Sequence, residues 1–300
     1  MTKKKSLWRR MWDQRAVYAM YLPYMLLFVT FTVVPVLISI GLSLTYFNVL
    51  QAPSWVGLTN YINLFMNDET FLIALKNTFI LACITGPLGY LMCFGFAWCI
   101  NELHPLLRTF YTFAFYSPSI SGNAYLIFTI LFSSDRYGFV NGWLIKLGLI
   151  DSPIQFFTDT KYMLGLCILV ILWSSLGTSL LVFIAGFQGV DRSLYEAGAV
   201  DGITNRFSEL WYITLPVMKP QLMLSAVLTI SSSFGVGSVI TGLVGFPSTN
   251  YAAHTIMHHL EDYGNMRFEM GYASAIATFL FVIMLAANSL IRRLLNRVGK

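Results

Sequence analysis

The chain has 300 residues, of which 56% are apolar and 11% are charged. A soluble domain carries about 25% charged residues, so this composition argues against an ordinary soluble enzyme. The net charge of +5 does not indicate nucleic-acid binding, because the basic residues follow a pattern of membrane orientation.

The charged residues are segregated and leave six long stretches without Asp, Glu, Lys or Arg. Each stretch can hold the roughly 20 apolar residues that a membrane-spanning helix needs. We therefore predict an all-α integral membrane protein with six transmembrane helices in a single domain, residues 1–300. The uncharged run after Arg15 is much longer than the roughly 7–15 apolar residues of a signal peptide, which indicates a retained first helix. In chain order the predicted helices cover residues 17–46, 72–100, 108–133, 162–189, 219–242 and 271–294.

The basic residues indicate the orientation of these helices. If both termini are cytoplasmic, 14 of the 19 Lys and Arg residues face the cytoplasm and 5 face the outside. The reverse orientation would invert this ratio and break the positive-inside rule, so we expect cytoplasmic termini. The cytoplasmic set is Lys3, Lys4, Lys5, Arg9, Arg10, Arg15, Arg108, Arg192, Arg206, Lys219, Arg292, Arg293, Arg297 and Lys300, and the external set is Lys76, Arg136, Lys146, Lys161 and Arg267.

The longest predicted cytoplasmic segment, residues 190–218, is a polar island between the fourth and fifth predicted helices. Asp191 or Ser193 can cap a short helix, and Glu196 follows Ser193 at the spacing of a capping box. The small residues after Glu196 would give this helix a thin face that another protein can approach closely. Gly202 would end the helix in the left-handed conformation that a C-terminal glycine adopts.

A second short helix is expected through Arg206 and Trp211, and Pro216 marks the start or a bend of the next span. An alternative from the residues alone is an amphipathic helix that lies on the lipid headgroups. The sequence contains no Gly-x-x-x-x-Gly-Lys-Ser/Thr phosphate-binding loop. It therefore cannot hydrolyse ATP by that route, and any ATP-driven step needs another chain.

The segment from Tyr195 to Pro216 resembles the cytoplasmic coupling loop of ABC-importer permeases. In that loop, Glu-Ala-Ala is followed by a Gly four residues after the second Ala and by a later Ile-x-Leu-Pro. Here Gly198 replaces the second Ala, and the interval from Gly202 to Ile213 is one residue longer than in the family. Further matches, from about Tyr18 to Arg293, resemble the maltose-type carbohydrate uptake family of binding-protein-dependent transport system inner membrane components. They are Tyr21-Leu-Pro23 to Pro35, Trp55 to Tyr61, Asn77-Thr78-Phe79, Gly138 to Asn141, and Trp173 with Gly177.

This resemblance implies a permease subunit that imports a carbohydrate, first of all an oligosaccharide, across the cytoplasmic membrane of a bacterium. Transport would proceed by alternating access, driven by two partner ATPase subunits that bind ATP and Mg²⁺, so this chain needs no cofactor and no catalytic residue. A second permease, usually a different chain, and an extracytoplasmic solute-binding protein would complete the complex. Alternative cargoes are a polyol, a glycerol-phosphate ester or a peptide. The loop residues implied in coupling to the ATPase are Glu196, Ala197, Gly198, Asp201, Gly202, Arg206 and Pro216.

Polar residues in three predicted helices fall at similar membrane depth and indicate a substrate path. Such residues are costly in a bilayer and are commonly functional. Their hydroxyls, amides and aromatic rings suit a sugar, and Pro118, Gly122, Gly235 and Gly237 could loosen or break the helices around them. The alternative is that the small polar residues are packing contacts between helices. The candidates are Tyr116, Ser119, Asn123, Trp173, Ser175, Thr178, Ser232, Phe234 and Ser238.

Three histidines, His254, His258 and His259, lie in the last predicted external segment. A four-residue spacing places two imidazoles on one helical face, as in zinc sites, and this raises a membrane metalloenzyme as an alternative of a different class. The cluster lacks the His-Glu-x-x-His order of a metalloprotease, so we expect no metal site. Instead we expect a loop helix that faces a docked binding protein or the solvent. An ion-coupled transporter or channel is not favoured, because no carboxylate or lysine lies deep in the predicted spans.

Overall fold

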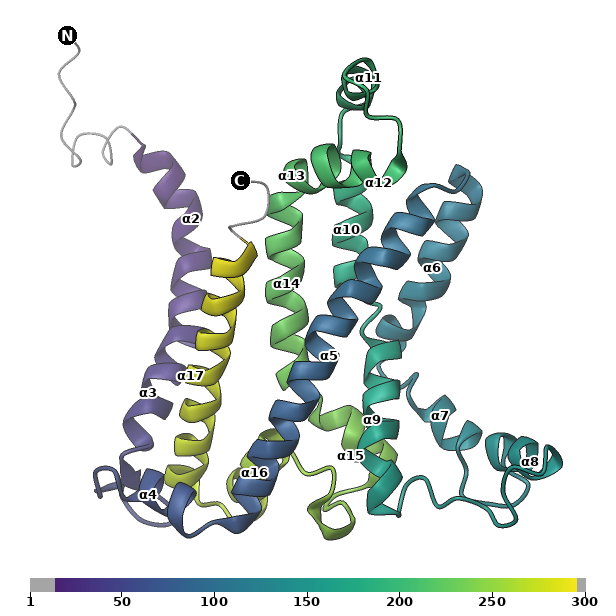
Figure 1. Ribbon diagram of the computed structural model, residues 1–300. Helices are drawn as coiled ribbons and strands as arrows, with labels where there is room; N and C mark the ends of the chain where they lie inside the picture. Colours follow the sequence, from purple (N-terminus) through teal and green to yellow (C-terminus); the bar gives the residue numbers. More distant parts are fainter. Residues whose placement is uncertain (1–13, 296–300) are drawn as a thin grey trace.

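The computed structural model describes residues 14–295, and these form a helical molecule with one small hairpin (Figure 1). The hairpin pairs β1 Thr45–Tyr46 with β2 Ser54–Trp55 in antiparallel fashion. The first half of the chain contains α2 Arg15–Phe28, the π turn η1 Val29–Val33, α3 Val34–Leu42, α4 Thr59–Met66, α5 Glu69–Asn101, α6 Pro105–Ser121, α7 Leu126–Leu131 and α8 Phe139–Lys146. The second half contains α9 Thr160–Ser174, α10 Thr178–Gln188, α11 Arg192–Val200, α12 Arg206–Glu209, the π turn η2 Leu210–Thr214, α13 Leu215–Val217, α14 Lys219–Phe234, α15 Gly237–Val244, the 3₁₀ turn η3 Thr249–Tyr251, α16 Ile256–Glu261, the π turn η4 Asp262–Met266 and α17 Met270–Leu295.

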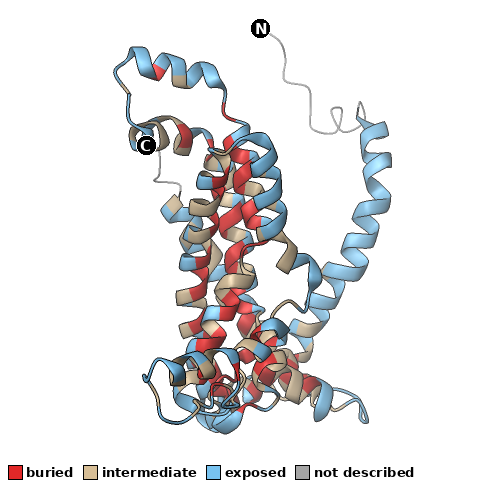
Figure 2. Cartoon of the chain, turned by 90° about the vertical axis from the view of Figure 1, so that its right-hand side faces the viewer, coloured by how far each residue is buried: buried red, intermediate tan, exposed pale blue. Residues whose placement is uncertain are grey.

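Helices α5, α10 and α14 pack against one another in the middle of the molecule, and α17 packs on α14. Figure 2 shows that the buried residues concentrate along this bundle. The segment from α2 through α3 has no buried residue and touches α17 through α3. Because this segment is apolar throughout, its exposed surface is one that lipid or another protein must cover.

Four helical segments are long and apolar enough to cross a membrane: Arg15–Leu42, Glu69–Asn101, Thr160–Gln188 and Met270–Leu295. A fifth is counted if Arg206–Val217 and Lys219–Phe234, which meet at an angle of 80°, are taken as one broken span. The expected all-helical, multi-pass architecture is therefore confirmed. The number six remains a prediction, because α6 with 17 residues and α14 with 16 residues are shorter than the roughly 20 residues of a full span.

Two predicted helices end at glycines that the sequence had indicated as weak points. The helix predicted over 108–133 is divided at Gly122, whose φ of +66° cannot continue a right-handed helix, and α7 follows as a separate segment. The helix predicted over 219–242 ends before Gly235, and α15 then runs across the bundle axis (Figure 1). Continuous helices over these two ranges were therefore wrong, while the expected breaks were correct.

The helix predicted over 162–189 is also divided, which the sequence analysis did not anticipate. The backbone leaves the helical conformation at Gly177, with φ −122° and ψ −130°. The Ser119 side chain of α6 lies directly against this point, since a Cβ on Gly177 would be 3.1 Å from the Ser119 Cβ. A larger residue would push α6 away from the break, so the glycine allows the two segments to cross closely.

The segment α11–α13, the start of α2 and the end of α17 all lie at one end of the bundle, and α4, α8 and α16 lie at the other (Figure 1). This arrangement agrees with a prediction that places both termini on the same side as the 190–218 segment. Which side faces the cytoplasm remains a prediction. Several of the basic residues that support it, in segments 1–13 and 296–300, lie outside the described residues.

Candidate functional site

Helix α11 begins at Asp191, whose side chain accepts a hydrogen bond from the Ser193 backbone N–H at 3.0 Å. This bond lowers the pKa of Asp191, because it favours the ionised carboxylate at the positive end of the helix. The alternative cap at Ser193 is therefore wrong, and so is the predicted capping box, since Ser193 already lies inside the helix. Glu196 is exposed on the middle turn of α11.

Gly202 ends α11 as predicted, with a φ of +90°. The Ile203 N–H donates to the Gly198 carbonyl at 2.8 Å, and the Gly202 N–H donates to the Ala199 carbonyl at 3.2 Å. These two bonds form a Schellman motif, which satisfies carbonyls that the helix end would otherwise leave unpaired. The loop therefore returns sharply toward the bundle at Gly202.

Gly198 is buried, in contrast to its neighbours. A Cβ on Gly198 would lie 2.6 Å from the Ile213 Cδ1, so this glycine lets Ile213 of the same chain pack directly onto α11. The expectation that Gly198 gives close access to a partner needs correction, because the contact it allows is within the chain. Substitution of the expected Ala by Gly thus has a packing reason.

The opposite side of the loop is open. Glu196, Ala197, Asp201 and Gly202 are exposed. Four large apolar residues of the same segment, which were not among the predicted site residues, are also exposed, by 89% at Val200, 68% at Phe207, 66% at Trp211 and 68% at Tyr212. Large exposed apolar side chains in one segment are typical of a surface that another protein covers.

Arg206 connects the second half of the loop to the bundle. Its guanidinium forms ion pairs with Glu209 at 2.9 Å and with Glu102, at the end of α5, at 3.4 Å. The adjacent Phe207 ring meets the Trp98 ring of α5 edge to face, with 5.3 Å between centroids. Arg206 therefore has a structural role within the chain.

A half-buried hydroxyl pair joins α11 to the π turn η2. The Thr214 hydroxyl donates to the Glu209 carbonyl at 3.2 Å, so the Tyr195 hydroxyl donates to Thr214, at 2.9 Å. A π turn takes in one residue more than an α-helical turn, and η2 lies in the interval from Gly202 to Ile213 that is one residue longer than the family pattern.

Pro216 is the second residue of α13 and lies near the end of the continuous helix Arg206–Val217, where a proline removes one helical hydrogen bond. Two residues later, Met218 is fully buried and lies against Gly186 of α10, where a Cβ would be 2.6 Å from the Met218 Cε. The loop is thereby seated on both α10 and α14.

A small cavity of about 180 Å³ lies between α5, α9, α14 and α15, in the middle of the bundle. Two of the predicted substrate-path residues, Ser175 and Ser232, line it. The sequence analysis missed Thr85 and Thr229, which also line it. The signal in the sequence was Gly89, one turn beyond Thr85, because a glycine within a helix can mark a close approach of another segment. In the structure, a Cβ on Gly89 would be 2.9 Å from the Ser175 Oγ.

Five of the six hydroxyl side chains that line this cavity make the same kind of hydrogen bond. Each of Thr85, Ser175, Thr229, Ser232 and Ser233 donates to a carbonyl of the preceding helical turn at 2.6–2.9 Å. Their protons are used within the chain, whereas the oxygen lone pairs remain able to accept. The cavity wall thus offers acceptors to a ligand that carries hydroxyl groups.

The other candidates are not brought together in this cavity. Phe234 is buried in the apolar core between α14 and α17, and Trp173 packs edge to face on Phe128 with 5.0 Å between centroids. Asn123 accepts from the Tyr125 hydroxyl at 3.3 Å. The remaining four lie on α6, α10 and α15 outside the cavity lining: Tyr116, half-buried, and Ser119, Thr178 and Ser238, exposed.

The three histidines are buried, with 2–3% of each residue exposed, so the expected solvent- or partner-facing helix is wrong. The His258 Nδ1 accepts from the Thr255 N–H at 3.1 Å, and its Nε2 is 3.1 Å from the Gly237 carbonyl, to which it donates. Both nitrogens are thus occupied in a neutral ring, and burial lowers the His258 pKa. Among residues 14–295 no group of three or more His, Cys, Asp or Glu side chains is placed to hold a metal ion.

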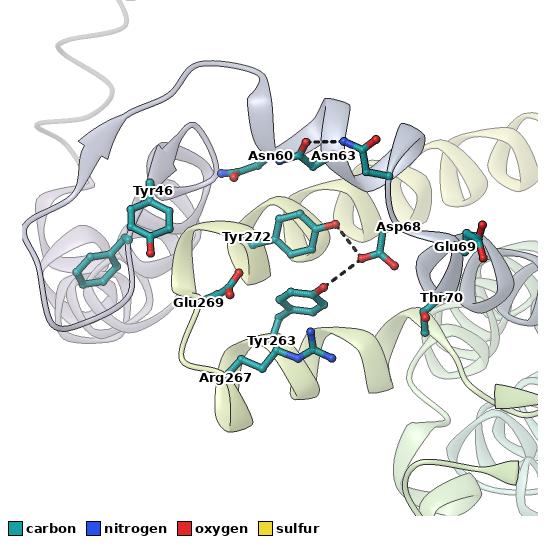
Figure 3. Close-up of a pocket in the computed structure, with 12 residues that line it drawn as sticks. Tyr46, Asn60, Asn63, Asp68, Glu69, Thr70, Tyr263, Arg267, Glu269 and Tyr272 are labelled. Carbon is teal, nitrogen blue, oxygen red and sulfur yellow. Dashed lines mark hydrogen bonds between the residues drawn. The ribbon is translucent and has the colours of Figure 1, made fainter. Parts of the chain in front are cut away.

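The buried His259 ring takes part in a hydrogen-bond network around the half-buried Asp68 carboxylate, at the end of the bundle opposite the loop. The His259 Nε2–H donates to one Asp68 oxygen at 3.0 Å. The hydroxyls of Tyr263 and Tyr272 donate to the same oxygen at 3.4 and 2.9 Å (Figure 3). Burial opposes ionisation, but the hydrogen bonds from His259 and the Phe71 N–H outweigh it and lower the Asp68 pKa to about 2. This network ties the start of α5 to η4 and α17.

Comparison with known proteins finds relatives that are all described as parts of transport systems. Residues 101–300 match the protein family described as "Binding-protein-dependent transport system inner membrane component". The chain is 32% identical over 290 residues to the probable ABC transporter permease protein YesP of Bacillus subtilis, covering 95% of this chain and 90% of that protein. It is 29% identical over 294 residues to the arabinooligosaccharides transport system permease protein AraP of the same organism, again covering 95% and 90%. A chain in the crystal structure of a bacterial ABC transporter involved in the import of the acidic polysaccharide alginate superposes with a TM-score of 0.78 at 26% identity, covering 99% of this chain and all of that one.

Proposed function

This chain belongs to the family of inner membrane components of binding-protein-dependent transport systems, and from that premise we propose that it is the permease subunit of an ABC importer for a carbohydrate. The observation that carries the proposal is the segment α11–α13. It presents a carboxylate and apolar side chains outward, and it is seated on α10 and α14 through Met218. A segment with this geometry can receive force from a partner and pass it into the bundle.

In this proposal the exposed side of α11, with Glu196 and Ala197, docks into a separate ATPase subunit. Apolar contacts from Val200, Trp211 and Tyr212 would supply most of the affinity, since large apolar and aromatic residues dominate protein interfaces. The Schellman turn at Gly202 sets the return angle of the loop. ATP and Mg²⁺ would bind in that partner, and its closure would move α11.

The cavity between α5, α9, α14 and α15 supports a carbohydrate as the cargo. Its wall combines hydroxyl oxygens that can accept from sugar hydroxyls with apolar side chains that suit sugar C–H groups. The volume of about 180 Å³ accommodates one sugar unit, so an oligosaccharide would pass with successive units in contact. The names of the relatives, which refer to arabinooligosaccharides and to alginate, favour an oligosaccharide over a polyol or a peptide.

The complete transporter would contain a second permease, two ATPase subunits and an extracytoplasmic solute-binding protein, in the cytoplasmic membrane of a bacterium. The uncovered segment α2–α3 supports a further protein subunit beside this chain. Six passes, with the α11–α13 end facing the cytoplasm, would place the binding protein at the end that carries α4, α8 and α16.

The test is to purify the tagged chain in mild detergent, identify the proteins that co-purify and measure ATP hydrolysis. A second permease and an ATPase, with hydrolysis raised by a sugar-loaded binding protein, are the expected result. In the Gly202→Pro variant, the partners should still be expressed and the chain should still insert into the membrane. The sugar-loaded binding protein should no longer stimulate ATP hydrolysis, because proline cannot adopt a φ of +90°. Full stimulation in Gly202→Pro would refute the assigned role of the loop.

A further inference from the structure

A second cavity, of about 510 Å³, lies between the α11–α12 segment and the ends of α5, α6 and α10. Figure 1 shows this region where the loop folds over the bundle. Three arginines from three separate elements line it: Arg108 of α6, Arg192 of α11 and Arg206 of α12. Guanidinium groups that converge from different elements on one cavity are the usual arrangement for binding an oxyanion.

The charges of this cavity are not balanced within the chain. Its two carboxylates, Glu102 and Glu209, both pair with Arg206. Among the described residues, Arg108 and Arg192 have no carboxylate within ion-pair distance. The three arginines and two carboxylates that line the cavity leave it with a net charge of +1, and it attracts an anion.

Arg108 provides the second and independent observation. Its Nη2 donates to the Leu103 carbonyl at 3.4 Å, but its Nε is buried and has no hydrogen-bond partner in this structure. A buried, charged N–H without an acceptor is unfavourable. Arg108 also lines the cavity, so an acceptor placed there can accept from the guanidinium N–H groups that Leu103 leaves free.

We propose that this cavity binds the phosphate group of an anionic ligand, which bridges Arg108 and Arg192 and thereby anchors α11 to α6. A phosphate presents several acceptor oxygens to guanidinium donors, and the cavity is larger than the phosphate alone, so it also holds part of the attached alcohol. Amide donors of Asn101 and Gln188 line the same wall. The ligand is either the headgroup of an anionic phospholipid, because the ends of spanning helices lie at headgroup level, or a soluble phosphate ester.

The inference rests on the proposed function only in naming α11 as the coupling element. Anchoring of α11 restricts the movement that coupling needs, so the anion acts as a regulator of the transporter. A bound phosphate would also hold Tyr195, which lines the cavity and bonds to Thr214. The whole loop would then respond to the ligand as one unit.

Hydrogen exchange of residues 192–200 in the assembled complex, without nucleotide or sugar, tests the proposal. One sample is in nanodiscs of phosphatidylcholine, a second in nanodiscs with added phosphatidylglycerol, and a third in phosphatidylcholine with inorganic phosphate. Loss of one guanidinium–phosphate contact changes local opening by about tenfold or more. We therefore expect at least tenfold slower exchange in one of the two anion-containing samples, and return to the fast rate in R108Q/R192Q.

The matched control is R136Q, which removes an exposed arginine at the other end of the molecule and should retain the protection. Protection with phosphatidylglycerol alone identifies a lipid site, and protection with inorganic phosphate identifies a soluble ligand. Equal exchange in all three samples, or protection that persists in R108Q/R192Q, overturns the proposal. Loss of the ATPase partner from R108Q/R192Q in every sample also overturns it, because the arginines would then bind an acidic partner surface. None of these results depends on sugar-stimulated ATPase activity, which tests the proposed function separately.

Discussion

Asp68→Asn should destabilise the end of the bundle that lies opposite the loop. The carboxylate of Asp68 accepts from the Phe71 N–H, from the His259 ring and from the Tyr272 hydroxyl. An amide can replace only one of the two carboxylate oxygens as an acceptor. The variant therefore leaves one or more of these donors, among them the buried His259 ring, facing an NH₂ group, and α5 loses part of its connection to α17.

The magnitude follows from the pKa of Asp68. A fall from 3.8 to about 2 corresponds to roughly 2 kcal/mol in favour of the ionised folded state, and solvent screening reduces this to about 1–2 kcal/mol. Because an unpaired buried donor adds a cost of about 1 kcal/mol, we expect the free energy of unfolding to fall by about 2–3 kcal/mol. In a thermal denaturation experiment on purified protein at neutral pH this loss lowers the midpoint by several degrees.

The pH dependence has a definite sign. Since the folded pKa of Asp68 lies below the unfolded value, its contribution is complete above about pH 4 and disappears as the pH falls toward about 2. The difference in midpoint between wild type and Asp68→Asn should therefore shrink over that range. The matched control is Asp262→Asn, which breaks a half-exposed ion pair with Arg267 and should cost less than about 1 kcal/mol. Equal midpoints for the two variants at neutral pH would refute the argument.

The remaining predictions concern the loop and the cavity. Glu196→Lys should remove stimulation of ATP hydrolysis by the loaded binding protein while the chain stays in the membrane, and unchanged transport would contradict the docking of α11. Gly198→Leu should cost about 1–3 kcal/mol by overpacking against Ile213, and addition of Ile213→Ala should restore thermal stability; no rescue would mean that the 2.6 Å contact is not the cause. Ser232→Ala should raise the sugar concentration for half-maximal transport by about 2–10-fold through the loss of one hydrogen bond, whereas Ser238→Ala, outside the cavity, should leave it unchanged.

The sequence predicted the helical, multi-pass fold because membrane insertion depends mainly on charge and apolarity along the chain, and both are visible in the residues. It also predicted the turn at Gly202, since few residues other than glycine adopt a φ of +90°. The break at Gly177 was not predictable in the same way. It depends on the approach of Ser119 from another helix, and such a contact has no local signature.

The candidate substrate residues show the same division between local and tertiary information. Polarity indicated Ser175 and Ser232, which line one cavity, but it could not distinguish the face of a helix that meets a cavity from the face that meets another helix. Phe234 follows Ser232 by only two residues and yet lies in the core against α17. The histidines were misplaced for a related reason, because the hydrogen bonds that allow His258 to be buried come from Thr255 and Gly237.

One continuous set of contacts joins the loop to the cavity. Ile213 packs on α11 at Gly198, and Met218 packs on α10 at Gly186. Further along, the Ser179 hydroxyl of α10 is 2.9 Å from the Thr229 hydroxyl of α14.

Since Thr229 donates its own proton to Ser225, Ser179 is the donor to Thr229, which also lines the cavity. Helices α10 and α14 are therefore held together both at the loop and at the cavity. A displacement of α11 should move them as one body and change the distance from Ser232 on α14 to Thr85 on α5. Contact along a path does not by itself establish energetic coupling. A double-mutant cycle between Met218→Ala and Ser179→Ala, with sugar-stimulated ATP hydrolysis as the readout, measures that coupling directly. Additive losses in the double mutant would show that the two contacts act independently and that force does not pass along this path.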